Sequence, residues 1–278
     1  MDEKERKIKD GELIVSKEDI LQMHKSLKYG GKPLASFILW ALRINKLNAV
    51  NAQNYHLNRN DFISGITHDL GLHYEISAQD LKKIPREGSF ILIGNHPFGG
   101  AEAIITLDFI KEIRPDFKFM ANFMLNKIKA MESFFIPVNP FENMRHLRSS
   151  YSGLKLASAH IQNHSALGIF PAGEVSTYQK ETGLISDKKW PKSIMKFIKA
   201  QNTIVIPVYF EGSNSKLFHF LGKIHPILRT IKLPSELSNK NGQLIKIKIG
   251  DAISLEKQNE FDNIEEYSRF LRESTYCF

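Results

Sequence analysis

The chain has 278 residues, of which 42% are hydrophobic and 24% are charged, so it is long enough and apolar enough to bury a globular core. Its 38 Lys and Arg exceed its 30 Asp and Glu, and the formal charge of +8 favours an anionic partner such as nucleic acid, acidic lipid headgroups or a phosphate-rich ligand. The single cysteine, Cys277, excludes an intrachain disulfide and fits a reducing compartment.

The N-terminal region, residues 1–75, is predicted to be helical and to form a membrane-interface region. Residues 1–10 carry charges of both signs with no apolar run behind them, so we expect no secretory signal peptide. The most apolar segment, residues 33–42, is about half the roughly 20 residues that a spanning helix needs. It carries Phe37 and Trp40 between flanking cations. This pattern is equally consistent with an interfacial helix and with a core helix.

From about Leu81 onward, short apolar runs alternate with amphipathic segments, which is typical of βαβ units. We therefore predict one α/β domain over residues 76–278, with a mostly parallel sheet flanked by helices. The last strand alternates Ile with Lys and is expected to be half-buried near a sheet edge. The predicted strands are Phe90–Ile93, Phe117–Met120, Phe134–Val138, Ala166–Phe170, Ile204–Tyr209 and Leu244–Ile249.

Two predicted helices carry a basic face opposite their apolar stripe. One spans residues 144–163 and includes Arg145 and Arg148, and the other follows Pro191. Each basic face alone is an ordinary solvated surface. Together with the overall positive charge and the interfacial helix candidate, they favour an acidic surface as the partner.

Chemistry is indicated where the first predicted strand ends, in the segment Gly94–Glu102. Ligands usually bind at the carboxyl ends of the strands in open α/β sheets. His96 can move a proton near neutral pH, and Glu102 stands six positions after it, across a glycine-containing turn. We expect the two side chains to lie within hydrogen-bonding reach. The alternative is a strand-to-helix loop with an incidental histidine.

Three further segments follow predicted strands and carry the residue patterns Ile-Pro-Val-Asn-Pro, Phe-Pro-Ala-Gly-Glu-Val-Ser and Ile-Pro-Val-Tyr-Phe-Glu-Gly. They begin at Ile136, Phe170 and Ile206. In their order and spacing after His96, they resemble the signatures of the glycerolipid acyltransferase superfamily. The similarity spans about residues 90–214 and is greatest to a bacterial subgroup described as haemolysin-like or lyso-ornithine-lipid acyltransferases.

The resemblance implies an O-acyl transfer without a cofactor or a metal, from an acyl-CoA or an acyl carrier protein to a lysolipid hydroxyl. In this reading His96 is the general base, and Glu102 fixes its tautomer and stabilises the imidazolium. Backbone amides of the Gly99–Gly100 or Phe170–Gly173 turns are expected to stabilise the oxyanion. The implied substrate-binding residues are Asn95, Gly99, Gly100, Asn139, Arg145, Phe170, Pro171, Gly173 and Glu174.

The chain departs from the superfamily pattern in ways that bear on the acceptor. The usual pattern places Asp five positions after the histidine, where this chain has Ala101 and then Glu102. Two arginines that commonly hold a phosphate are replaced by Val138 and Val175. We therefore expect a lyso-amino-acid lipid, such as an ornithine or glycine lipid, as the acceptor. Glu174 would repel a phosphate and could meet an ammonium.

Other functions stay open at this stage. A lysophosphatidic acid acyltransferase that binds phosphate through Arg145 or Arg148 is the main alternative, and a non-catalytic lipid-binding protein of the same fold is a further one. A serine hydrolase is disfavoured because Gly-x-Ser-x-Gly is absent, and no nucleic-acid-binding motif is present. We expect peripheral attachment to an anionic membrane surface, on the cytoplasmic face of the inner membrane.

Overall fold

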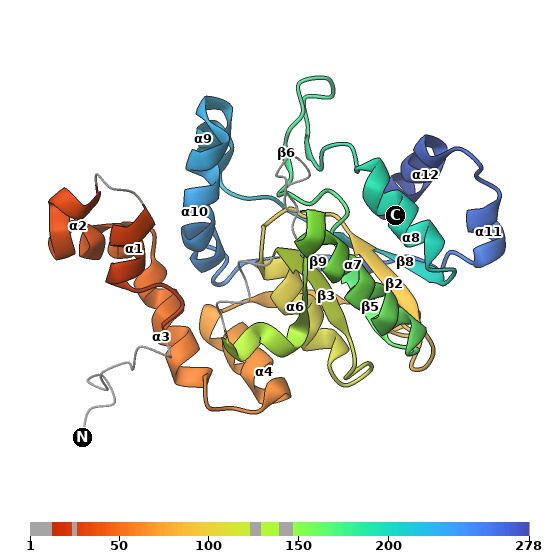
Figure 1. The fold of residues 1–278 in the computed structure, drawn as a ribbon, viewed down its shortest axis with the longest axis horizontal. Helices are drawn as coiled ribbons and strands as arrows, with labels where there is room; N and C mark the ends of the chain where they lie inside the picture. Colours follow the sequence, from red (N-terminus) through yellow and green to blue (C-terminus); the bar gives the residue numbers. More distant parts are fainter. Residues whose placement is uncertain (1–12, 24–26, 123–128, 139–146, 278) are drawn as a thin grey trace. The chain divides into compact units, whose positions relative to one another are not determined.

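The computed structural model describes residues 13–23, 27–122, 129–138 and 147–277, and the chain divides into two compact units (Figure 1). The helical unit comprises the residues up to Leu72 together with Ser215–Gln243. The sheet unit comprises His73–Asn214 together with the residues from Leu244 onward. The sequence prediction put the boundary after residue 75 and kept residues 215–243 with the sheet. In the structure those residues cluster with the N-terminal helices instead.

Helices account for the regular structure described in the helical unit. Their bounds are α1 (Lys17–Met23), α2 (Leu27–Ala41), α3 (Ile44–Asn54), α4 (Arg59–Leu70), α9 (Lys216–Ile224) and α10 (Pro226–Ser238). The second half of α2 corresponds to the predicted apolar segment; it buries Ala35 and Leu39 and leaves Phe37 and Trp40 59% and 68% exposed. A bend at Gly31, whose φ is 55°, precedes it. None of the described helices is long and apolar enough to cross a membrane.

The sheet unit is built on a mostly parallel sheet, as the sequence predicts. Its seven described strands have the order β1-β9-β8-β2-β5-β3-β4, and only the β8–β9 pair is antiparallel. The predicted strands agree with the observed ones to within two residues at each end. Their bounds are β1 (His73–Ile76), β2 (Phe90–Gly94), β3 (Lys118–Asn122), β4 (Phe135–Val138), β5 (Ala166–Ile169), β8 (Ile204–Phe210) and β9 (Leu244–Ile249).

Burial explains which strands the sequence reveals. Every residue of β2 is buried, so its apolar run is continuous, whereas β9 alternates exposed and buried residues next to the edge strand. The edge strand β1 has no buried residue, and the sequence prediction missed it. A short hairpin of β6 (Thr177–Tyr178) and β7 (Ile185–Ser186) was also missed.

Helices pack on the sheet and complete the core. The remaining bounds are α5 (Ala78–Leu81), α6 (Ala101–Ile110), η4 (Lys129–Phe134), α7 (Leu147–Gln162), α8 (Lys192–Ala200), α11 (Leu255–Asn259) and α12 (Ile264–Tyr276). Helix α7 packs on β4 and β5, and α12 packs on α8 and β8 (Figure 1). Their shared core includes Ile91, Trp190 and Tyr267. Because β2, β3, β4, β5 and β8 run parallel, their carboxyl ends meet at one edge of the sheet, where the candidate site lies.

Candidate active site

His96 lies just after the central strand β2, where the chain turns toward helix α6. The preceding Asn95 is buried and anchors this turn. Its side-chain NH2 donates to the carbonyl oxygen of Phe210 at 2.9 Å, and its side-chain oxygen accepts from the Phe210 amide at 2.8 Å. We expected Asn95 to bind substrate. Both ends of its amide tie the end of β2 to the end of β8, directly before His96.

The carboxylate of Glu102 lies in the first turn of α6 and is fully buried. Its Oε1 lies 2.7 Å from His96 Nδ1 and accepts hydrogen bonds from the amides of Phe98 and Gly99, each at 3.0 Å. Its Oε2 accepts from the Gly100 amide at 2.9 Å. The contact with His96 is an ion pair only when the imidazole is protonated. Three amides at a helix N-terminus thus hold an ionised carboxylate beneath the imidazole.

The backbone of this turn requires glycine, and its amides bear on the expected oxyanion donors. Gly99 has a φ of 85°, a left-handed conformation that suits glycine. We expected amides of the Gly99–Gly100 turn or of the Phe170–Gly173 turn to be oxyanion donors. Gly99 and Gly100 donate to Glu102, and Gly173 donates to the carbonyl oxygen of Phe170 at 3.0 Å. These three amides are therefore already engaged, because their hydrogen bonds hold the protein's own turns.

The charges around the imidazole set the protonation of the pair. Burial lowers the pKa of His96, but the charge and contact of Glu102 and the charge of Asp187 outweigh burial and raise the pKa above its usual value. Burial raises the pKa of Glu102, but His96 and the amide of Gly99 outweigh burial and lower the pKa. The arrangement keeps the carboxylate ionised and favours an imidazole that accepts a proton.

Aromatic rings fix the plane of the imidazole. The ring of Phe170 stacks on His96 with centroids 4.4 Å apart and an interplanar angle of 14°. Phe170 in turn stacks on Phe119 at 5.0 Å and 14°. The His96 side chain is 17% exposed while its Nδ1 is buried, so the accessible edge of the ring carries Nε2. Phe170 was predicted to bind substrate, and the structure places it as the stacking partner of His96.

A second buried carboxylate, Asp187, lies beside the same turn and was missed by the sequence analysis. Its Oδ1 accepts from the His96 amide at 3.1 Å and from the hydroxyl of Ser176, and its Oδ2 accepts from Trp190 Nε1 at 3.2 Å. The Tyr276 hydroxyl accepts from the Asp187 amide at 2.9 Å. Asp187 therefore links the β2 turn, the Phe170–Ser176 segment and the C-terminal helix α12.

The other predicted substrate-binding residues fall into two groups. Pro171 is buried, Gly173 is exposed, and Glu174 forms an ion pair with Lys188 at 2.8 Å. This ion pair neutralises the carboxylate that we expected to meet a substrate ammonium. Asn139 and Arg145 lie outside the described residues.

The two valines that replace arginines also have defined places. Val138 ends β4 and is half-buried, and Val175 is buried, with 8% exposed. Neither position offers a cation to an acceptor.

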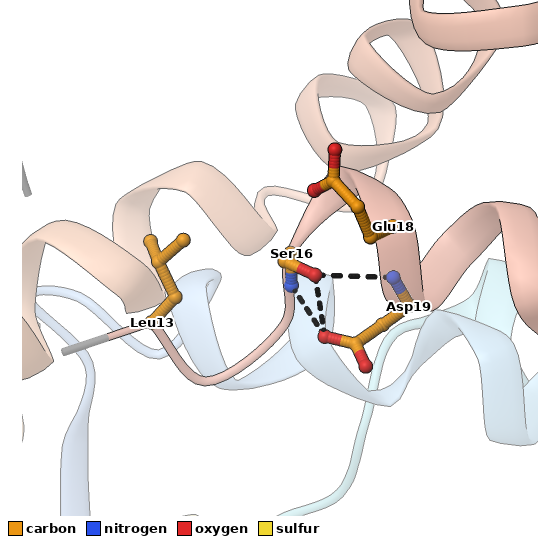
Figure 2. A pocket seen from close by; sticks show the side chains of 4 residues that line it. All are labelled: Leu13, Ser16, Glu18 and Asp19. Atoms are coloured by element: carbon orange, nitrogen blue, oxygen red, sulfur yellow. Dashed lines mark hydrogen bonds between the residues drawn. The ribbon is translucent and has the colours of Figure 1, made fainter. Parts of the chain in front are cut away.

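A surface hollow of about 380 Å³ lies elsewhere, in the helical unit (Figure 2). Its lining residues are Leu13, Ser16, Glu18 and Asp19. The Ser16 amide donates to Asp19 Oδ2 at 2.8 Å, and the Asp19 amide donates to Ser16 Oγ at 3.0 Å. These bonds cap the start of α1 and account for the polar groups of Ser16 and Asp19.

Comparisons with known proteins agree with the geometry. A protein-family model described as acyltransferase matches residues 31–278. Two relatives are named lyso-glycine lipid O-acyltransferase. The protein from Bacteroides thetaiotaomicron is 22% identical over 261 residues, covering 91% of this chain and 92% of the relative. The protein from Phocaeicola vulgatus is 22% identical over 277 residues, covering 96% of each.

A solved structure has the same fold. It is the 1-acyl-sn-glycerophosphate acyltransferase PlsC from Thermotoga maritima, with a TM-score of 0.50 and 16% sequence identity. The match covers 89% of this chain and 85% of that one.

Proposed function

The chain belongs to the acyltransferase family, and from this premise we propose that it is a lysolipid O-acyltransferase whose acceptor is a lyso-amino-acid lipid. Both relatives are named for a lyso-glycine lipid, and they cover nearly the whole chain. A glycine lipid is therefore the acceptor we place first. The observation that carries the proposal is the contact of His96 Nδ1 with the buried Glu102 carboxylate at 2.7 Å, which leaves Nε2 on the accessible edge of the ring.

The proposed reaction proceeds by direct transfer. His96 Nε2 takes the proton of the acceptor hydroxyl as the oxygen attacks the carbonyl carbon of an acyl thioester. The tetrahedral intermediate then expels the thiolate, which takes the proton from the imidazolium. A new ester and a free thiol result. Glu102 stabilises the imidazolium between these steps, and Phe170 prevents the ring from turning out of line.

An oxyanion donor is still required. The amide of Ala172 donates no hydrogen bond within the described residues, and it lies in the turn that Phe170 begins. We assign it this role in place of the engaged amides of Gly99, Gly100 and Gly173. The donor thioester is an acyl-CoA or an acyl carrier protein.

The chain's residues also support an acceptor without a phosphate. Val138 and Val175 place apolar groups where phosphate-binding arginines commonly stand in the superfamily. A phosphate dianion beside apolar groups would lose its hydration without compensation. An acceptor with a hydroxyl, an amide and at most one carboxylate fits better.

An acyl-transfer assay tests this function. Purified protein is offered acyl-CoA and acyl carrier protein donors, with lyso-glycine lipid, lyso-ornithine lipid and lysophosphatidic acid as acceptors. We expect the highest kcat/KM with an amino-acid lysolipid, and loss of transfer in His96→Ala. A higher kcat/KM for lysophosphatidic acid would refute the acceptor assignment. Lipid binding without acyl transfer would refute the proposed transferase activity.

We further propose peripheral attachment to the cytoplasmic face of the inner membrane through the N-terminal helices. The rings of Phe37 and Trp40 lie 5.8 Å apart on the exposed side of α2, and the exposed Lys32 and Arg43 flank the apolar segment 33–42 that carries them. An apolar helix face between cations is typical of interfacial binding.

A further inference from the structure

Helices α9 and α10 expose six large apolar side chains. The two helices pack against each other as a hairpin, and Phe218 of α9 is fully buried on its inner side. Isolated exposed apolar residues are normal, but a group of this size on one hairpin indicates an interaction surface. The six are Leu217, Phe220, Ile224, Ile227, Leu228 and Ile231, with exposed fractions from 38% to 59%. We call them the hairpin apolar surface.

The exposed charged side chains of the same hairpin are all cationic. Residues 212–235 contain no Asp or Glu but include Lys216, Lys223, Arg229 and Lys232. Lys216 and Lys223 are exposed on α9, at either end of its apolar stripe. Apolar side chains between cations match the two layers of an anionic lipid surface, the acyl region and the headgroups.

The hairpin is held from its inner side, so its exposed face is not needed to hold it together. The amide and hydroxyl of Ser215 donate to the carboxylate of Glu236 at 2.9 and 2.7 Å. Lys232 Nζ lies 3.1 Å from the same carboxylate. Glu236 is the only acidic residue from Ser215 to Ser238, and it is buried. The outer face thus keeps no negative charge.

We propose that the α9–α10 hairpin docks on the surface of an anionic lipid bilayer, with Phe220 and Ile224 inserted and Lys216 and Lys223 at the headgroups. An acidic protein would pair with the lysines but leave the hairpin apolar surface unmatched, whereas a bilayer matches both. The inference rests on the proposed function, because a lysolipid acceptor resides in a bilayer. It adds a second contact to the one expected from α2, and both belong to the helical unit.

Vesicle binding of the full chain tests the proposal. Co-sedimentation is measured with phosphatidylcholine vesicles and with vesicles enriched in phosphatidylglycerol. Phe220→Ser combined with Ile224→Ser should lower partitioning into phosphatidylglycerol-rich vesicles about tenfold or more, because two inserted side chains stay in water. Lys216→Glu combined with Lys223→Glu should lower it at low salt and have little effect on neutral vesicles. Leu244→Ser is the matched control, because Leu244 is 57% exposed but lies on β9.

Acyl transfer separates this proposal from the proposed function. With a short-chain acceptor dissolved below its micelle concentration, the Phe220/Ile224 variant should match wild type, whereas with a long-chain acceptor in vesicles it should be slower. Unchanged vesicle partitioning in a variant with wild-type thermal stability would overturn the docking surface. Loss of acyl carrier protein binding with intact vesicle binding would overturn it too, in favour of a protein partner. A wild-type chain that acylates no acceptor would overturn the function, while the partitioning data would stay interpretable.

Discussion

Replacing Glu102 with glutamine tests the catalytic pair, because the two side chains have the same shape and only the carboxylate carries a charge and accepts at both oxygens. Glu102 meets four donors in the structure: three backbone amides and His96 Nδ1. With the glutamine oxygen in the Oε1 position, its NH2 faces the Gly100 amide and one hydrogen bond is lost. With the amide reversed, its NH2 faces Nδ1, which forces the proton onto Nε2 and disables the base.

The first arrangement costs less, so the expected loss of kcat/KM is worked out from it. Glutamine then still orients the imidazole but no longer stabilises its charge. A hydrogen bond to a charged group contributes about 1.5–3 kcal/mol, which corresponds to a loss of about 10- to 150-fold in kcat/KM. His96→Ala removes the base altogether and should cost more, about 10²–10⁴-fold. Thiol release from acyl-CoA, with a lyso-glycine lipid as acceptor, measures both variants.

The pH profile distinguishes this role from a structural one. Transfer needs the neutral imidazole, so kcat/KM should rise with pH through the pKa of His96. Because Glu102 raises that pKa, Glu102→Gln should move the acid limb to lower pH, and its deficit should be smallest in acid. Glu260→Gln, an exposed site, is the matched control. A Glu102→Gln enzyme with wild-type kcat/KM and an unmoved acid limb would refute the pairing.

Three further outcomes are expected. Asp187→Asn should also move the acid limb of kcat/KM to lower pH, because the Asp187 charge raises the pKa of His96. It should lower Tm as well, because a buried acceptor of Trp190 is replaced. If the acid limb does not move, Asp187 contributes to stability alone. Gly99→Ala should lower both Tm and kcat/KM because its φ is 85°, whereas Gly88→Ala, with a φ of 77°, should lower Tm only; equal kinetics in the two would contradict the role of the turn. Removing residues 17–47 should weaken vesicle binding while the sheet unit stays folded, and binding that is insensitive to salt would assign the attachment to apolar insertion.

The sheet and the His96 turn were predictable because local sequence determines them. A buried parallel strand needs a continuous apolar run, and the turns that follow such strands need glycine or proline, so β2, β5 and β8 stand out. Strand β1 has no buried residue and leaves no such run. Its place at the edge is fixed by pairing with β9, far away in the sequence, which a local pattern does not reveal.

The role of Asp187 and the grouping of residues 215–243 depend on tertiary contacts. Asp187 follows a two-residue strand and has no glycine or proline beside it, so no strand-end pattern marks it. The nearby Trp190 was the one available signal, since a buried indole N–H requires an acceptor. Glu236 carries no distinguishing sequence pattern, and only the fold brings Ser215 to it.

The two glycines of the turn and the later position of the acid belong together as one structural change. The superfamily pattern that the sequence resembles has an aspartate five positions after the histidine, whereas here the turn contains Gly99 and Gly100 and the acid comes one position later. The two glycine amides point into the turn and need an acceptor, and a glutamate one methylene longer reaches both of them and Nδ1. One carboxylate thereby closes the helix N-terminus and polarises the histidine. The Gly99 and Gly100 amides are thereby engaged by Glu102, which is why we propose the amide of Ala172, in the turn that Phe170 begins, as the oxyanion donor.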